Sequence, residues 1–150
     1  MAGHYTCMLT HFVWGTKDRE LWLTAPVTER LYPYFGGILE NRKCCLLQAG
    51  GMADHVHLLV SVHPTESTSD LAAVLKANSS RWLREDMGML GQFAWQEGYG
   101  AFSVSRSLQR AVVEYIVNQL SHHQGRTFEE EFKAMLARHE VVYEERYLWA

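Results

Sequence analysis

The sequence lacks most of the features that mark secreted and membrane proteins. It has three cysteines among 150 residues, and two of them, Cys44 and Cys45, are adjacent. This pattern indicates neither a disulfide framework nor a C-x-x-C metal site. No apolar run approaches the roughly 20 residues that a bilayer-spanning helix needs. Residues 1–5 carry no basic patch followed by an apolar core, as a signal peptide would. We therefore expect a cytoplasmic protein with no membrane contact.

A strong excess of basic residues is also missing. Fourteen Lys and Arg residues are set against 17 Asp and Glu residues, which gives a net charge of -3 with neutral histidines. A general nucleic-acid coat protein would normally be strongly basic, so the composition argues against that class. The charge is uneven, however, because residues 76–110 hold five basic and three acidic side chains. A local basic face could follow from this, although most such imbalances are solvated surfaces.

The composition that is present is typical of a globular protein with a hydrophobic core. Hydrophobic residues make up 47% of the chain and charged residues 21%, both ordinary values. A chain of this length fits one domain spanning residues 1–150.

The first half of the chain predicts alternating strands and helices. Residues 4–14 are rich in β-formers and predict a strand. A helix follows Thr24, and Pro33 inside it should cost a hydrogen bond or kink the helix. Residues 44–48 predict a second strand, and Gly50-Gly51 are expected to turn the chain into a third strand that ends near His63.

The second half predicts helices with short strands between them. Ser67 or Ser69 is expected to cap a helix that runs to about Arg84. Residues 93–96 and 99–105 predict two short strands separated by Gly98. A later helix is expected at 108–123, capped by Ser107, and its apolar side would carry Val112, Val113, Ile116 and Leu120. The last helix is expected at 127–138, where Thr127 and Glu130 resemble a capping box.

This order of elements predicts the fold class. The helices are too few for a doubly wound parallel sheet, and several strands are joined by short connections. We therefore expect an α+β fold, an antiparallel β-sheet with helices packed on its faces in a ferredoxin-like or RRM-like αβ sandwich.

Two histidines on the third predicted strand suggest a metal site. His55 and His57 are two residues apart, so their side chains point to the same side of a strand. Two imidazoles on one side can hold one divalent cation. The alternative is a pair of half-buried, hydrogen-bonded histidines. Asp54 could orient one imidazole or close a turn, and His11 could lie near the metal or be a packed strand residue.

A second candidate segment lies in the helix predicted at 108–123. Tyr115 and Gln119 are four residues apart and are expected on one helical face. A glutamine carbonyl is a suitable ligand for Mg²⁺ or Mn²⁺. A tyrosine is a poor nucleophile unless a metal or base assists it. If this helix docks near His55 and His57, a phenol would lie beside a metal and could attack a phosphodiester. From spacing alone, Tyr115 could equally be an ordinary amphipathic helix residue.

These motifs resemble those of a known family. His55-Val56-His57 is similar to the HUH signature, and Tyr115-Ile116-x-x-Gln119-x-x-His122-His123 is similar to the catalytic helix of single-tyrosine transposases. The chain resembles the TnpA-type transposases of small bacterial and archaeal insertion sequences. Further segments that look like that family follow in the right order: Val13-Trp14-Gly15-Thr16-Lys17, Gly50-Gly51-Met52-Ala53-Asp54-His55-Val56-His57-Leu58-Leu59, Asn78-Ser79-Ser80-Arg81-Trp82-Leu83, Trp95-Gln96-Glu97-Gly98-Tyr99-Gly100-Ala101-Phe102 and Tyr143-Glu144-Glu145-Arg146-Tyr147-Leu148-Trp149.

The resemblance implies a specific chemistry. Tyr115 would be the catalytic nucleophile and would form a 5′-phosphotyrosine link to single-stranded DNA. His55, His57 and Gln119 would bind Mg²⁺ or Mn²⁺. The family acts as a homodimer, recognises DNA hairpins and uses no nucleotide cofactor. The tyrosine helix can be docked in cis or in trans, and the sequence leaves that open.

The resemblance also gives the basic residues a role. Side chains in a hairpin-binding protein contact bases in single strands and the phosphate backbone. The candidates for DNA binding are Lys76, Arg81, Arg84, Arg106 and Arg110, and each of them could equally be a solvated surface residue.

Two other functional classes bear on the same residues. A histidine-triad nucleotide hydrolase needs His-x-His-x-His, and here the third position is Leu59, which excludes that class. A domesticated hairpin-DNA-binding regulator with the same fold but no strand transfer stays open, although Tyr115, Gln119 and the histidine pair argue against it.

Overall fold

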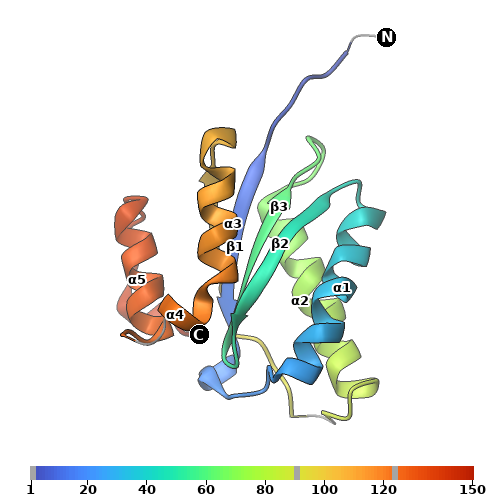
Figure 1. Cartoon of the computed structure of the whole chain (residues 1–150). Coiled ribbons are helices and arrows are strands. Elements are labelled where there is room, and N and C mark those ends of the chain that lie inside the picture. Colours follow the sequence, from blue (N-terminus) through green and yellow to red (C-terminus); the bar gives the residue numbers. More distant parts are fainter. Residues whose placement is uncertain (1–2, 90–91, 123–124) are drawn as a thin grey trace.

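The computed structural model describes residues 3–89, 92–122 and 125–150. These residues contain one four-stranded sheet, of which Figure 1 labels β1, β2 and β3. The strand order is β2-β3-β1-β4, and every neighbouring pair is antiparallel. The strands are β1 (Leu9–Gly15), β2 (Cys45–Met52), β3 (His55–Ser61) and β4 (Gly100–Val104).

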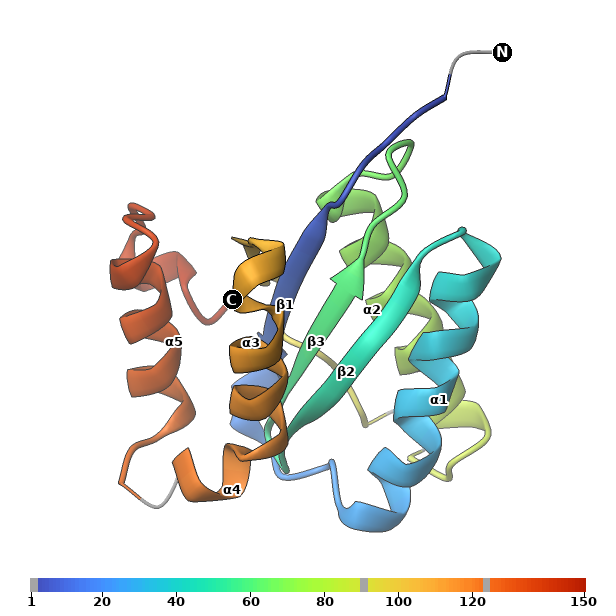
Figure 2. The ribbon, with the colours of Figure 1, turned by 45° about the horizontal axis from the view of Figure 1, so that its top comes forward.

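Helices cover both faces of this sheet (Figure 2). On one face lie α1 (Ala25–Asn41) and α2 (Thr68–Glu85), and on the other lie α3 (Gln109–Val117), α4 (Gln119–His122) and α5 (Phe128–Arg138). Short 3₁₀ turns complete the described elements: η1 (Lys17–Arg19), η2 (Arg106–Leu108) and η3 (Glu145–Tyr147). The βαββαβ order of the first part of the chain and the antiparallel sheet confirm the predicted ferredoxin-like α+β fold. None of the helices in the described ranges is long and apolar enough to span a bilayer.

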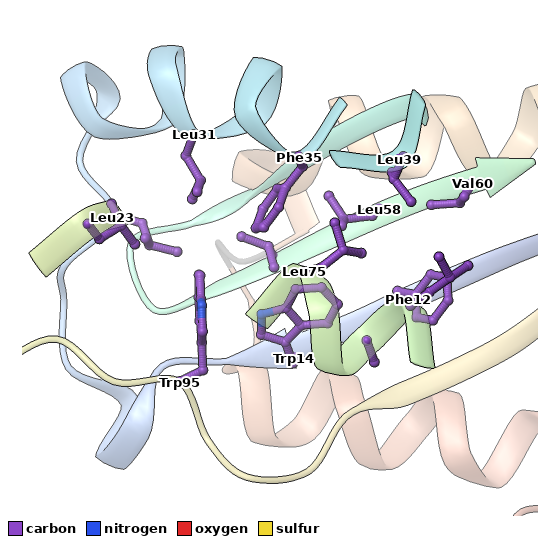
Figure 3. Close-up of a cluster of buried hydrophobic side chains, with 14 of the residues drawn as sticks. Phe12, Trp14, Leu23, Leu31, Phe35, Leu39, Leu58, Val60, Leu75 and Trp95 are labelled. Atoms are coloured by element: carbon purple, nitrogen blue, oxygen red, sulfur yellow. The ribbon is translucent and has the colours of Figure 1, made fainter. Parts of the chain in front are cut away.

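The face toward α1 and α2 holds the main hydrophobic core (Figure 3). Alternate residues of β3, Val56, Leu58 and Val60, point into it and are fully buried. Phe12 and Trp14 from β1 join them, as do apolar side chains from both helices. Burying a side chain of this size contributes about 1.5–3 kcal/mol. This cluster therefore supplies much of the stability and holds β1 and β3 in register.

The intervening residues of β3 point to the other face. There Leu59 packs with Leu9 and with Ile116 of α3. α5 packs against Val13 of β1 and Phe102 of β4. Between these two small clusters lie His55 and His57, so this face combines apolar and polar side chains.

Gly50 and Gly51 do not form the predicted turn. Both lie within β2, where Gly50 pairs with His57 and Gly51 with Val56, and the chain turns at residues 53–54. A methyl group on Gly50 would lie 2.5 Å from the backbone oxygen of Ile116. Gly50 is therefore needed because α3 approaches the strand closely, and glycine composition alone cannot distinguish this reason from a turn.

Other predicted strand boundaries were wrong. β1 begins at Leu9, not at residue 4, because β3 and β4 both end opposite Leu9. Residues 93–96 are extended, but in the described part of the chain their ladder pairing is one isolated bridge between Trp95 and Thr16. Hydrophobicity indicated burial correctly at Phe93 and Trp95, but burial against helices does not require a strand partner.

The helix predicted at 108–123 is interrupted. α3 ends at Val117, Asn118 leaves the helical conformation, and α4 begins at Gln119. The N-cap of α3 is Leu108 and not the predicted Ser107. Leu120 was predicted to lie on the apolar side of the helix, but its side chain is exposed. The predicted end at His123 lies outside the described residues.

The remaining helices lie where they were predicted, although in the described chain the Thr24 side chain makes no capping hydrogen bond. α1 begins after Thr24 and runs through Pro33. The Ser67 side chain accepts a hydrogen bond from the Asp70 backbone N–H at the start of α2. Thr127 does the same for Glu130 at the start of α5.

Candidate active site

Four elements bring polar side chains together on the α3–α5 face of the sheet. β3 supplies His55 and His57, α3 supplies Tyr115, and α4 supplies Gln119. α5 adds Glu131, which the sequence did not single out. The histidines, Gln119 and Glu131 are each at most 2% exposed. Buried polar groups of this kind need partners, since an unpaired one is costly.

The partners form one continuous network. Nε2 of His55 lies 2.9 Å from Oε1 of Gln119. Nε2 of His57 lies 2.9 Å from Oε1 of Glu131. The Gln119 amide donates to the second carboxylate oxygen of Glu131 at 3.2 Å, and the Tyr115 hydroxyl donates to that same oxygen. The two sequence-predicted segments therefore meet at one carboxylate, although the single predicted helix is divided into α3 and α4.

The far sides of the two imidazoles are held as well. Nδ1 of His55 lies 2.7 Å from Oδ1 of Asp54, and its ring stacks on Phe128 at 4.2 Å between centroids. Nδ1 of His57 lies 2.8 Å from Nε2 of His11. Partners on Nδ1 direct Nε2 of each histidine toward the centre of the site, which is the arrangement seen around metal-binding histidines.

Burial and hydrogen bonding shift the pKa values in this network strongly. Burial alone would lower the pKa of His55, but hydrogen bonds with Asp54, Glu131 and Gln119 raise the pKa to about 9. Burial and the neighbouring His57 lower the pKa of His11 to about 3, so His11 is neutral. Burial alone would raise the pKa of Glu131, but the hydrogen bonds from His55 and His57 hold the pKa far below its usual range. Glu131 is therefore an anion beside a cationic His55.

Tyr115 is half-buried, unlike the fully enclosed His55, His57 and Glu131. Burial and the hydrogen bond to Glu131 raise the pKa of its phenol to about 12, so the hydroxyl is protonated at neutral pH. Its ring borders a cavity of about 270 Å³ between α3, β4 and α5. Arg138 and His139 line the same cavity. A ligand in this cavity would lie beside Tyr115.

The donor set fits a divalent metal ion. One ligand atom each from His55, His57 and Glu131 lie within 4.8 Å of one another, and all three residues are buried. The amide oxygen of Gln119 adjoins Nε2 of His55. Imidazole nitrogens with carboxylate and amide oxygens suit Mn²⁺ and related ions.

The basic residues predicted to bind DNA are divided between the two sides of the molecule. Lys76, Arg81 and Arg84 belong to α2, across the sheet from the histidines. The Lys76 ammonium donates to the backbone oxygens of Glu97 and Gly98, both at 2.8 Å. Arg106 and Arg110 belong to η2 and α3, on the side of the site. DNA binding by any of the five stays a prediction.

The sequence around Glu131 contains a pattern from which its burial in a site could have been predicted. α5 carries apolar residues at Phe128, Phe132 and Met135, spaced for one helical face. Glu131 occupies a position on that same face, three residues after Phe128 and four before Met135. A carboxylate within an apolar stripe must be buried with a partner, which is a reason to suspect a site.

Comparisons with known proteins identify the family of the chain. A family model described as IS200-like transposase matches residues 4–119. The chain is 28% identical over 116 residues to the ISDra2 transposase TnpA of Deinococcus radiodurans, covering 73% of this chain and 81% of that protein. It is 33% identical over 96 residues to the IS200 transposase of Salmonella typhimurium, covering 57% of this chain and 61% of that protein.

Solved structures share the fold. A crystal structure of a candidate transposase from Deinococcus radiodurans superposes with a TM-score of 0.65 at 27% identity, covering 79% of this chain and 95% of that one. A REP-associated tyrosine transposase bound to a REP hairpin has a TM-score of 0.60 at 15% identity, covering 82% of this chain and 73% of that one, and supports the fold alone. The family match spans β1 to Gln119 and includes both histidines and Tyr115, so the chain belongs to the IS200-like transposase family.

Proposed function

We propose that this transposase is metal-dependent and cuts and rejoins single-stranded DNA through a 5′-phosphotyrosine intermediate. The observation that carries the proposal is the position of Tyr115. Its hydroxyl donates to Glu131, which also contacts Nε2 of His57, while Gln119 contacts Nε2 of His55. A phenol without a catalytic role would not need to join a buried set of metal-ligating groups.

In the cleavage step the Tyr115 oxygen bonds to the phosphorus of the scissile phosphodiester. The bond from phosphorus to the 3′ oxygen breaks, the phenol releases its proton to water, and the departing 3′ oxygen takes a proton from water. The DNA 5′ phosphate is then linked to Tyr115. Attack by a free 3′ hydroxyl on that link rejoins DNA, and because one ester bond replaces another, no nucleotide cofactor is required.

His55, His57 and Gln119 would hold the metal ion, Mg²⁺ or Mn²⁺. A bound divalent cation supplies Lewis-acid polarisation of the phosphodiester. Asp54 and His11 orient the two imidazoles, and the α5 helix shields them from water. The cavity beside Tyr115 supports entry of the scissile strand between α3 and α5, where Arg138 offers a cation for phosphate.

The substrate we propose is single-stranded DNA with hairpins at the element ends, and the active species a homodimer. The solved relative bound to a REP hairpin supports a hairpin ligand. Arg106 and Arg110 are the better-placed candidates for backbone contacts, since they lie on the side of the site.

A denaturing gel tests the proposal. The purified protein is incubated with Mn²⁺ or Mg²⁺ and labelled single-stranded DNA that carries its own element ends. We expect a covalent protein–DNA band that disappears with chelator and with Tyr115→Phe.

Hairpin binding measured in parallel is the control. Tyr115→Phe removes one hydroxyl and should bind hairpin DNA as tightly as the unaltered protein. If the unaltered protein binds the hairpin tightly but forms no covalent band, the protein is a DNA-binding regulator of this fold and the proposed chemistry is wrong.

A further inference from the structure

Glu131 lies outside the region that the family match covers, which ends at residue 119. Its carboxylate nevertheless occupies the centre of the site. One oxygen lies 2.9 Å from Nε2 of His57 and 3.4 Å from Nε2 of His55. The other oxygen accepts from Tyr115 and from the Gln119 amide.

Charge explains why a carboxylate is needed there. A metal ion binds neutral imidazoles, so His55 would release its proton when the ion binds. Two neutral imidazoles and an amide would then leave the two positive charges of the ion uncompensated. The side chains around it are almost fully buried, and an uncompensated buried charge is costly. A carboxylate in direct reach of both Nε2 atoms removes much of that cost.

Neighbouring carboxylates are already engaged elsewhere. Asp54 contacts Nδ1 of His55, on the far side of the ring from the site. Glu129 forms an ion pair with Arg19 at 2.9 Å. Glu130 is exposed and contacts the Thr127 hydroxyl at 3.3 Å. Glu131 is the acid whose position matches the two imidazoles.

We propose that Glu131 is the anionic ligand of the metal ion, through the oxygen that now contacts His55 and His57. This inference rests on the proposed metal-dependent function and adds α5 to the catalytic unit. The second oxygen keeps its contact with Tyr115, so one residue joins the metal site to the nucleophile. Glu131 thus explains why a helix beyond the matched region packs against the histidines.

Calorimetric titration with Mn²⁺ tests the inference without DNA. The full chain is compared with Glu131→Gln, which has nearly the same shape but no charge, and with Glu130→Gln as a matched control one residue away. We expect Glu131→Gln to weaken Mn²⁺ binding at least tenfold, because even groups that only orient metal ligands cost 10–100-fold when they are removed. Glu130→Gln should bind as the unaltered protein does.

Infrared difference spectra distinguish ligation from an indirect structural effect. Adding Mn²⁺ should shift carboxylate bands in the unaltered protein and in Glu130→Gln, but not in Glu131→Gln. If Glu131→Gln does not fold, Glu131→Asp keeps the carboxylate and should bind Mn²⁺ more weakly while retaining a band shift.

The outcomes separate this inference from the proposed function. Equal Mn²⁺ affinity in Glu131→Gln and Glu130→Gln, or a band shift that persists in Glu131→Gln, would overturn the ligand role and leave the covalent chemistry of Tyr115 standing. Failure of the unaltered protein to bind Mn²⁺ at all would overturn the metal site and the ligand role together.

Discussion

The two faces of the sheet use the same strands for different purposes. Val56, Leu58 and Val60 point toward α1 and α2 into a purely apolar cluster (Figure 3). Their neighbours His55 and His57 point toward α3–α5 into a polar network. The first face gains free energy by removing apolar area from water. The second face buries groups whose desolvation is costly unless each finds a partner.

This difference shows that one face of the sheet supplies most of the stability and the other face holds the reactive groups. Buried ionic clusters are often no more stable than apolar replacements of the same shape. A network of five polar side chains on one face therefore has no clear advantage for folding alone. The apolar face provides a rigid support, and the polar face can then hold reactive groups in place.

The largest expected effect on stability comes from shortening a buried side chain on the apolar face. Leu58→Ala should lower the free energy of unfolding by about 2–5 kcal/mol, because it leaves a cavity in a fully enclosed cluster. Its neighbour Leu59 is also fully buried but packs in the small cluster under α3. Leu59→Ala should cost less stability, since α3 can settle into the space, but should reduce covalent-band formation more.

Urea unfolding and the DNA gel measure these two quantities in both variants. The comparison of the faces would fail if Leu59→Ala were the more destabilising change while its covalent band stayed at full strength.

An intermediate effect is expected where α3 touches the sheet. Gly50→Ala would place a methyl group 2.5 Å from the Ile116 oxygen, and such overpacking costs about 1–3 kcal/mol. It should also displace α3 and weaken the covalent band. Thermal unfolding and the gel report both effects.

Gly37→Ala is the matched control for that change. Gly37 is exposed in α1, and among the described residues an added methyl group would meet no atom within 4 Å. Because alanine favours a helix over glycine by about 0.5–1 kcal/mol, this variant should be slightly more stable and fully active. Equal destabilisation by both substitutions would contradict the close approach at Gly50.

The smallest effect concerns a charge at the rim of the apolar side. Burial lowers the pKa of Lys76 to about 8, below the usual 10.5. Between pH 8 and 10.5 the unfolded chain therefore binds more protons at Lys76 than the folded one, and this residue makes stability rise with pH. Lys76→Met lacks that contribution.

Urea unfolding of both proteins at pH 7.5, 9 and 10.5 checks the sign. The difference in unfolding free energy between the unaltered protein and Lys76→Met should shift in favour of the unaltered protein as the pH rises. A constant difference would mean that the Lys76 pKa is not lowered by folding.

Much of the fold could be predicted because its signals are local. Apolar spacing, the Ser67 and Thr127 caps and the β-branched run around His57 depend on residues close in sequence. The sequence order of strands and helices was enough to indicate the ferredoxin-like class. The misplaced Gly50-Gly51 turn was not a local problem, since the close approach of α3 to Gly50 decides it.

The sequence by itself determined which chemical groups are available: two histidines on one side of a strand, a tyrosine and glutamine four residues apart, and enough apolar surface for one core. Only the tertiary structure decided that Glu131 lies among them, that His11 and Asp54 orient the imidazoles, and that Lys76, Arg81 and Arg84 lie across the sheet. The physical reason is that burial and hydrogen bonding act between residues distant in sequence. Glu131 is 74 residues from His57 in the chain, and their contact exists only because α5 packs on the same face of the sheet.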